Sequence, residues 1–344
     1  MTTPDILLVD LESESQTPCP LQDDFPFGFS IALGNFDGVH AAHRELISLA
    51  TQMAQRLCEQ GQPTQSAAFF FRAPSGDYIF PRQDGHLNTL SEKMQLFRSC
   101  GLRYVFMADF PSLRHWDAES FMSVILQKFC AARAVCCGYN FRFGKAGAGT
   151  PEMLQNFFGK HCSVLPCQMI RADESNDLAI SSSTVRRLLQ RGDSFMAASM
   201  LRYPYVICGT VVHGKQLGRT LGFPTANLCI PAEKLLPRCG VYASIVLFDG
   251  ATYPGVSNVG KRPTVDAPGV SVNCETYLLD FCGDLYDKEI FVFLLHHLRD
   301  EMAFSDLDAL KAAIAADISR TKQLLSDEKS AEFFTNIREY FKKD

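Results

Sequence analysis

The stretch GKQLGRTLGFPTANL, residues 214–228, combines closely spaced glycines with two positive side chains and ends in a Thr-x-Asn pair. Glycine adopts positive φ without strain, so successive backbone N–H groups in such a loop can form a cradle for phosphate. Positive side chains within the loop strengthen that cradle. The glycines and cations of this predicted phosphate loop are Gly214, Lys215, Gly218, Arg219 and Gly222.

The end of the same stretch predicts a strand that holds a metal ion. Pro224 has no N–H to donate to a ladder and therefore suits the start of a strand. Residues i and i+2 of a strand share a face, so Thr225 and Asn227 point the same way. Hydroxyl and amide oxygens suit Mg²⁺ that is shared with nucleotide phosphates. A glycine-rich hairpin whose Thr and Asn bond to neighbouring backbone explains the spacing equally well.

The residues that surround this loop predict a domain of short strands. The strand-like segments, separated by glycine-containing turns, are 203–214, 240–248, 252–260, 272–281 and 288–298. This pattern is typical of an antiparallel sheet or a small barrel. A final helix is expected from Ser305, which has capping-box spacing to Asp308. Glu275, in the strand VNCETYLLDF, is either a general base for a substrate hydroxyl or a solvated residue on an exposed face.

The first half of the chain alternates strands with helices. The expected strands are 27–34, 66–71, 104–110 and 133–140, and the expected helices are 43–61, 91–101 and 118–130. Such alternation indicates a parallel sheet with crossover helices. A helical stretch over 183–202 precedes the change of pattern, so we expect two domains, 1–202 and 203–344.

The composition excludes several classes of protein. With 344 residues, 47 % apolar residues and a net charge of −5, the chain does not have the basic balance of a general nucleic-acid or membrane-surface binder. It contains no apolar run of the roughly 18 residues that cross a membrane. Its 13 cysteines form no Cys-x-x-Cys pair, which favours reduced thiols in a cytoplasmic protein over a zinc site. The composition leaves room for a weak homo-oligomer.

A second candidate loop lies in IALGNFDGVHAAHRELI, residues 31–47. His40 and His43 fall at the start of a helix, where backbone N–H groups attract phosphate and imidazoles can neutralise charge that develops on it. The loop also follows a strand, which is where open α/β sheets bind ligands. Two histidines that only cap a helix, or that hold a metal, explain His-x-x-His as well.

Ordered blocks make residues 204–320 resemble the riboflavin kinase domain of bacterial bifunctional riboflavin kinase/FAD synthetases. The blocks are VVHGKQLGRTLGFPTANL, GVYASIVLF, GVSNVGKRPTV and the segment from Glu275 to Phe304. The resemblance implies a six-stranded barrel with a C-terminal helix, which uses ATP and Mg²⁺ to phosphorylate riboflavin. It implies that Thr225 and Asn227 hold Mg²⁺ and phosphate, that Glu275 is the base toward the ribityl 5′-hydroxyl, and that Arg299 lies near the flavin. Asp287 departs from the glycine that is usual in the family.

The first half resembles the FAD synthetase module of the same family. GNFDGVHAAH is similar to its GNFDGVHxGH signature, and CGYNFRFGKAGAG and ISSSTVRRLLQRGD are similar to its second and third blocks. The resemblance implies a Rossmann-like α/β nucleotidyltransferase domain that transfers AMP from ATP to FMN, giving FAD and pyrophosphate. The positions that it assigns to ATP and FMN are Gly34, Asn35, Phe36, Asp37, Gly38, His40, His43, Asn140, Ser182 and Arg186, with Asn140 on the flavin side.

This first half also departs from the family pattern. Ala42 replaces a glycine of the signature, and Gly147 stands where the family usually has arginine. FRAPS (71–75) replaces FEPHP, and Ser183 and Thr184 replace Thr and Arg of the third block. Together these changes remove positive charge and a histidine from the expected triphosphate site.

Three functions follow from the sequence. The preferred hypothesis is a bifunctional enzyme that makes FMN from riboflavin and then FAD from FMN. The alternative is a riboflavin kinase whose first domain is a nucleotide-binding or scaffold module. A flavin-binding sensor without turnover is a third, but a binder has no need of a base at Glu275.

Overall fold

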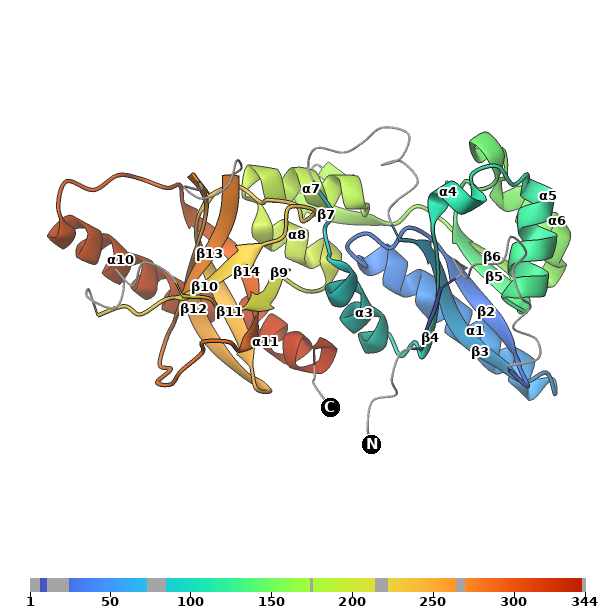
Figure 1. The fold of residues 1–344 in the computed structure, drawn as a ribbon, viewed down its shortest axis with the longest axis horizontal. Helices are drawn as coiled ribbons and strands as arrows, with labels where there is room; N and C mark the ends of the chain where they lie inside the picture. The colour runs from blue at the N-terminus through green and yellow to red at the C-terminus, as the bar shows by residue number, and fades with distance from the viewer. Residues whose placement is uncertain are drawn as a thin grey trace. The chain divides into compact units, whose positions relative to one another are not determined.

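The computed structural model describes residues 7–10, 25–72, 85–173, 176–213, 222–263 and 270–341. The chain divides into two compact units (Figure 1). The first contains Met1–Gln83 and Lys93–Arg171, and the second contains Asp84–Glu92 and Ala172–Asp344. One division therefore falls inside helix α3 (Leu90–Ser99), between Glu92 and Lys93.

The first unit is built on a parallel sheet, as its alternating sequence predicts. Its strands are β1 (Leu7–Asp10), β2 (Gly28–Leu33), β3 (Thr64–Phe71), β4 (Tyr104–Ala108), β5 (Ala132–Gly138) and β6 (Cys162–Leu165). They lie in the order β1-β4-β3-β2-β5-β6, and every neighbouring pair is parallel. The strand order reverses beside β2, because β3 lies on one side of it and β5 on the other.

Both faces of the sheet are buried at β2, which explains why this strand has no polar alternation. Phe29 and Ile31 belong to the core cluster that includes Phe121 and Ile125 of the π-helical segment Phe121–Phe129. The opposite face of β2 carries small residues and lies against helix α1 (Figure 1). The helices of this unit, besides α3, are α1 (Ala41–Glu59), α4 (Phe110–Leu113), α5 (Ala118–Ser120) and α6 (Pro151–Phe158).

The second unit contains the expected antiparallel barrel. Its strands are β9 (Tyr205–Thr210), β10 (Ala226–Ile230), β11 (Gly240–Phe248), β12 (Ala251–Pro263), β13 (Val270–Leu278) and β14 (Glu289–Arg299). They lie in the order β10-β13-β12-β11-β14-β9, and all pairs are antiparallel. An isolated bridge between Val212 and Asn227 joins the end that follows β9 to β10, so the sheet is almost closed.

A chain of buried hydroxyls lies inside the barrel. Ser244 and Ser257 share a hydrogen bond of 2.7 Å, and Ser257 and Thr276 share one of 2.8 Å. All three residues are fully buried, so each hydroxyl needs a partner. A slip of one residue in β12 or β13 would turn a hydroxyl outward and leave its partner unpaired. The hydroxyl chain therefore helps to fix the register of three neighbouring strands.

Two helix boundaries differ from the sequence-based expectation. The single helix expected over 183–202 is two helices, α7 (Ser182–Arg191) and α8 (Ser194–Leu201), because Gly192 has φ +89° and ends the first. The capping box at Ser305 was wrong. Helix α10 (Leu307–Leu325) is capped by Asp306, whose Oδ1 accepts a hydrogen bond from the Ala309 N–H at 2.8 Å.

A two-stranded sheet and a last helix complete the description of the elements. Strands β7 (Met169–Asp173) and β8 (Asn176–Ala179) pair with each other, and helix α11 (Glu328–Tyr340) follows α10. Helices α10 and α11 both contact β11 and β12 of the barrel. In the part of the chain that the structure describes, no helix is long and apolar enough to cross a membrane.

A buried ion pair ties the start of helix α3 to Lys234, in the loop between β10 and β11. Lys234 Nζ lies 2.5 Å from Glu92 Oε2, and both side chains are fully buried. Lys234 also donates to the Leu87 carbonyl at 3.0 Å, and Glu92 Oε1 accepts from the Cys208 N–H at 3.1 Å. Each charge therefore has several partners, as a buried charge requires.

We predict that Lys234→Met destabilises the barrel unit by about 3–5 kcal/mol, because it leaves the Glu92 carboxylate buried without its cation. The control is Arg238→Met. Arg238 pairs with Asp300, but their side chains are 44 % and 60 % exposed, so its loss should destabilise the protein far less than the loss of Lys234. Urea unfolding of both variants measures the difference, and equal effects would contradict the assignment.

Candidate active sites

The register of the barrel brings two of the sequence-predicted residues together. Asn227 of β10 is the direct cross-strand partner of Glu275 of β13, and Asn258 of β12 flanks Glu275 on the other side. Directly opposed side chains in an antiparallel pair have Cβ atoms about 5 Å apart. The alternate residues of both strands, Leu228 and Cys274, are fully buried, so Asn227 and Glu275 share the outer face of the barrel.

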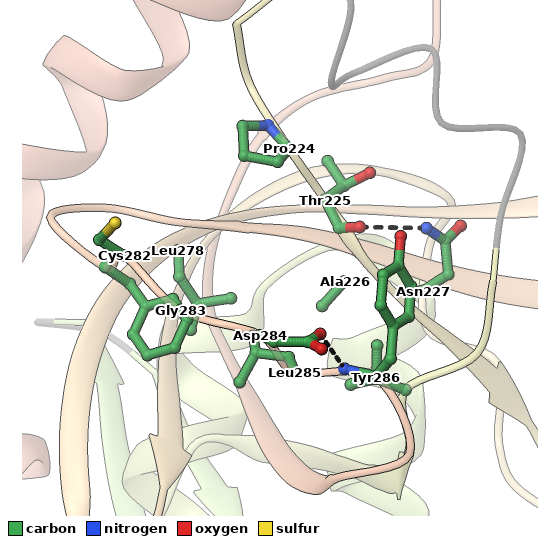
Figure 2. Close-up of a pocket in the computed structure, with 12 residues that line it drawn as sticks. Pro224, Thr225, Ala226, Asn227, Leu278, Cys282, Gly283, Asp284, Leu285 and Tyr286 are labelled. Carbon is green, nitrogen blue, oxygen red and sulfur yellow. Dashed lines mark hydrogen bonds between the residues drawn. The ribbon is translucent and has the colours of Figure 1, made fainter.

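Thr225 stands immediately before β10, beside Asn227 (Figure 2). The Asn227 amide donates from Nδ2 to the Thr225 carbonyl at 3.3 Å, which leaves its Oδ1 oriented as an acceptor. A hydroxyl and an amide oxygen are a fitting but incomplete ligand set for Mg²⁺. Among the described residues, no group of three or more His, Cys, Asp or Glu could hold a metal ion. A cation at this place would therefore take further ligands from nucleotide phosphates.

Thr225 and Asn227 line a cavity of about 560 Å³. Its other wall is the loop between β13 and β14, which the sequence analysis did not assign to the site (Figure 2). This wall consists of Phe281, Cys282, Gly283, Asp284, Leu285 and Tyr286. The Tyr286 ring stacks on His213 with centroids 3.9 Å apart. Apolar and aromatic groups beside polar oxygens suit a ligand with a flat ring and a phosphate tail.

Of the other residues predicted for the kinase-type site, the structure describes Gly222 and Arg299. Gly222 has φ +87°, the conformation for which a glycine is needed. Gly214, Lys215, Gly218 and Arg219 lie outside the described residues. Arg299, at the end of β14, donates to both carboxylate oxygens of Asp317 in α10, the shortest contact being 2.8 Å.

Asp287 occupies a turn that explains the glycine usual in the family. Its φ is +60°, in the left-handed region that glycine adopts without strain. Aspartate tolerates this region better than most side chains. The Asp287 N–H donates to the Val211 carbonyl at 3.1 Å, so the turn is retained despite the substitution.

The loop between β2 and α1 is a strained turn in the first unit. Phe36 has φ +49°, Gly38 has φ +87° and Val39 has φ +35°. Positive φ is rare for a phenylalanine and exceptional for a β-branched valine. Both side chains are fully buried, so packing holds the backbone in this conformation. Strain of this kind is concentrated at ligand-binding sites, where it fixes the direction of backbone N–H groups.

The two histidines at the start of α1 form one unit. His40 is the N-cap, and its Nδ1 accepts from the His43 N–H at 3.4 Å. A neutral His40 therefore carries its proton on Nε2. The two rings stack with centroids 3.7 Å apart and planes at 13°. Burial lowers the pKa of His40 to about 4 and the pKa of His43 well below its usual value, so both rings are neutral at pH 7.

These histidines lie where the fold places ligands. Ligands of open α/β sheets bind beyond the carboxyl ends of the strands, where the strand order reverses, and here that point lies between β2 and β5. The loop of residues 34–40 follows β2, and the exposed Asn140 follows β5. Within the described residues, the buried His43 Nδ1 has no hydrogen-bond partner, as expected of a group that meets a ligand. Ser182 and Arg186 lie on α7, which belongs to the second unit.

The structure also describes most of the departures from the family pattern. Ala42 lies half-buried in the first turn of α1, where it adopts ordinary helical backbone. Gly147 has φ +68°, so the backbone here suits glycine and would strain an arginine. In the segment 71–75, Phe71 ends β3 and the Arg72 N–H donates to the Ala108 carbonyl. Residues 73–75 lie outside the described part.

One residue at this loop was missed from the sequence. Lys93 of α3 is buried and donates from Nζ to the Asn35 carbonyl at 3.2 Å. Burial lowers its pKa to about 8, against the opposing effect of the Asp37 carboxylate. A signal was present, because Lys93 shares a helical face with the apolar Leu96 and Phe97. A cation in an apolar stripe is unusual unless it has a buried partner.

Comparison with known proteins gives matches to both halves. A family model described as riboflavin kinase matches residues 201–325, and one described as FAD synthetase matches residues 24–184. A crystal structure from Streptococcus pneumoniae, titled macrolide-efflux protein, is similar with a TM-score of 0.78 and 26 % identity, over 92 % of this chain and 99 % of that one.

Three relatives named bifunctional riboflavin kinase/FMN adenylyltransferase are similar over most of the chain. The Escherichia coli K12 protein is 35 % identical over 84 % of this chain and 90 % of its own length. The Pseudomonas fluorescens protein is 33 % identical over 86 % and 93 %, and the Bacillus subtilis protein 32 % over 90 % and 93 %. The chain therefore belongs to the family of bifunctional riboflavin kinase/FMN adenylyltransferases.

Proposed function

We propose that this enzyme phosphorylates riboflavin to FMN with ATP and then transfers AMP from a second ATP to FMN, giving FAD and pyrophosphate. We assign the kinase step to residues 203–344 and adenylyl transfer to residues 1–202. The matches of separate family models to the two halves support this division. The observation that carries the kinase assignment is the pairing of Asn227 with Glu275 in one register, beside a cavity that Asn227 lines.

In the kinase step, Glu275 accepts the proton of the ribityl 5′-hydroxyl as its oxygen bonds to the γ-phosphorus of ATP and ADP leaves. Phosphoryl transfer depends mainly on positioning and on neutralising phosphate charge, so one base and a few oxygen ligands suffice. Mg²⁺, when bound, would supply that neutralisation. Thr225 Oγ1 and Asn227 Oδ1 are the protein ligands that we assign to it, together with the expected phosphate loop at 214–222.

In the adenylyl step, a phosphate oxygen of FMN bonds to the α-phosphorus of ATP and pyrophosphate leaves. The attacking phosphate is already ionised at neutral pH, so this step needs no base. It needs stabilisation of negative charge on the leaving group. Backbone N–H groups of the strained loop and the start of α1 supply it, with His40 and His43 as neutral hydrogen-bond donors. Asn140, Ser182 and Arg186 stay assigned to FMN and ATP.

We propose the cytoplasm as the compartment, because all cysteines in the described ranges are free thiols. Small molecules are the partners that both sites require: ATP, riboflavin and FMN. Nucleic acid and membrane have no part in this proposal, and a weak homo-oligomer remains compatible with it.

Glu275→Gln should lower the kinase kcat by about 10²–10⁴-fold, because the amide cannot accept the hydroxyl proton. FAD formation from supplied FMN should stay at the wild-type rate. The matched control is Glu289→Gln, on the exposed start of β14, which should leave both rates unchanged. Chromatographic rates of both reactions give the answer, and an unchanged kinase kcat in Glu275→Gln would refute its role as base.

Thr225→Val should raise the Mg²⁺ concentration that half-saturates the kinase reaction by about 10-fold or more, as expected for losing one bond to a charged group. The substitution keeps the shape of the side chain and removes its oxygen. The Mg²⁺ dependence of adenylyl transfer in the same protein is the internal control. A Mg²⁺ titration that is identical for Thr225→Val and the wild type would exclude Thr225 as a metal ligand.

The lowered pKa of His40 predicts a pH dependence of stability. Burial lowers the folded-state pKa to about 4 from a usual value of 6.5, so the unfolded chain binds more protons between these values. Stability is therefore retained above pH 6.5 and falls as the pH drops toward 4, by about 2 kcal/mol between pH 7 and pH 5.

His40→Asn tests this, because asparagine can still cap α1 but does not titrate. Urea unfolding at pH 7 and pH 5 should show a larger loss for the wild type than for His40→Asn. Equal losses in the two proteins would mean that His40 is not held neutral by the fold.

A further inference from the structure

The buried lysine at the loop between β2 and α1 has no part in the mechanism above. Lys93 is 6 % exposed, and its Nζ donates to the Asn35 carbonyl at 3.2 Å. The ammonium lies 4.7 Å from the centre of the Phe70 ring of β3. A lysine that only filled this space would be a poor choice, because burying its charge is costly and methionine has a similar length without that cost.

The charged groups around Lys93 come from the loop and from α1. The Asp37 carboxylate of the loop raises the pKa of Lys93, and the Lys93 charge helps to lower the pKa of His43 in α1. His40 stacks on His43. On its own helix, the preceding Glu92 directs its carboxylate to Lys234 at 2.5 Å. The charge of the Lys93 ammonium therefore acts on the loop, through Asp37, and on His43 of α1.

We propose that Lys93 is a positioning residue for adenylyl transfer, which holds the strained loop of residues 34–40 through the Asn35 carbonyl and gives the triphosphate subsite a fixed positive charge. This inference rests on the proposed adenylyl transfer and deepens it. The loop backbone has positive φ at Phe36 and Val39, so an anchor at Asn35, directly before Phe36, matters for the direction of the loop's N–H groups. The anchor comes from a helix rather than from the loop itself.

Lys93 also supplies positive charge to a site that has few cations. Gly147 stands where the family usually has arginine, and its φ of +68° suits glycine. A buried charge acts in a low dielectric and is screened little by salt, so one fixed ammonium can offset the loss of an exposed cation. After burial and the neighbouring His40, Lys93 is a further cause of the lowered pKa of His43, and a neutral ring can donate or accept as the ligand requires.

The lowered pKa of Lys93 predicts a pH dependence of adenylyl transfer that a lysine with only a packing role would not cause. With a pKa of about 8, the ammonium loses its charge within the working range of the enzyme, while His40 and His43 stay neutral throughout it. The kcat/KM of adenylyl transfer should therefore fall above pH 8, approaching tenfold per pH unit. The kinase step, which does not use this loop, provides the control within the same polypeptide.

The experiment measures kcat/KM for ATP between pH 6.5 and 9.5, with supplied FMN for adenylyl transfer and with riboflavin for the kinase. Wild type should show the fall above pH 8 in adenylyl transfer alone. Lys93→Met should raise the KM for ATP and lower kcat/KM by about tenfold or more, with no break near pH 8. Lys93→Arg keeps its charge at every pH tested and should restore activity without the break. Lys128→Met, an exposed lysine of the same unit, should behave as wild type.

A wild-type adenylyl profile without a break near pH 8, or Lys93→Met with wild-type KM and kcat, would overturn the role of Lys93 and leave the proposed function intact. The wild-type profile decides even if a variant fails to fold. Absence of FAD formation by the wild type at every pH would overturn the adenylyl transfer itself, and this role with it.

Discussion

The antiparallel register of β13 against β10 and β12 is the constraint on which the kinase-type site depends. Side chains alternate across a strand, so a slip of one residue would move Glu275 to the barrel interior and Thr276 to the outer face. The hydroxyl chain from Ser244 through Ser257 to Thr276 opposes that slip from the inside. The buried polar groups therefore specify which carboxylate reaches the outer face opposite Asn227. The hydroxyl chain inside the barrel therefore links stability to function, because it fixes the register that places Glu275 opposite Asn227.

We propose that the two units catalyse related reactions with different groups. Both must stabilise negative charge on phosphate during transfer. In the mechanism that we propose, the barrel unit provides oxygen ligands for a cation and a carboxylate for a proton, because its acceptor is an alcohol. In the same proposal, the parallel-sheet unit provides a strained turn, a helix start and neutral histidines, because its acceptor is already an anion. The strain of Phe36 and Val39 is offset by the complete burial of both side chains.

Much of this arrangement follows from patterns that are local in sequence. The alternation of strands with helices predicted the parallel sheet, and short strands separated by glycine-containing turns predicted an antiparallel sheet or small barrel. Contacts between distant segments were harder to foresee. The stacking of Tyr286 on His213 and the bond from Lys93 to the Asn35 carbonyl each join residues more than fifty positions apart. The cap of α10 at Asp306 instead of Ser305 reflects a different limit, because neighbouring residues with equal capping ability cannot be ranked from sequence alone.

The most direct test of the account is a time course of the purified enzyme with riboflavin, excess ATP and Mg²⁺, in which riboflavin, FMN and FAD are separated by liquid chromatography. FMN should appear first, and FAD should then form at its expense. FMN that accumulates without conversion would contradict the bifunctional assignment. It would leave a riboflavin kinase whose first domain binds nucleotide or serves as a scaffold.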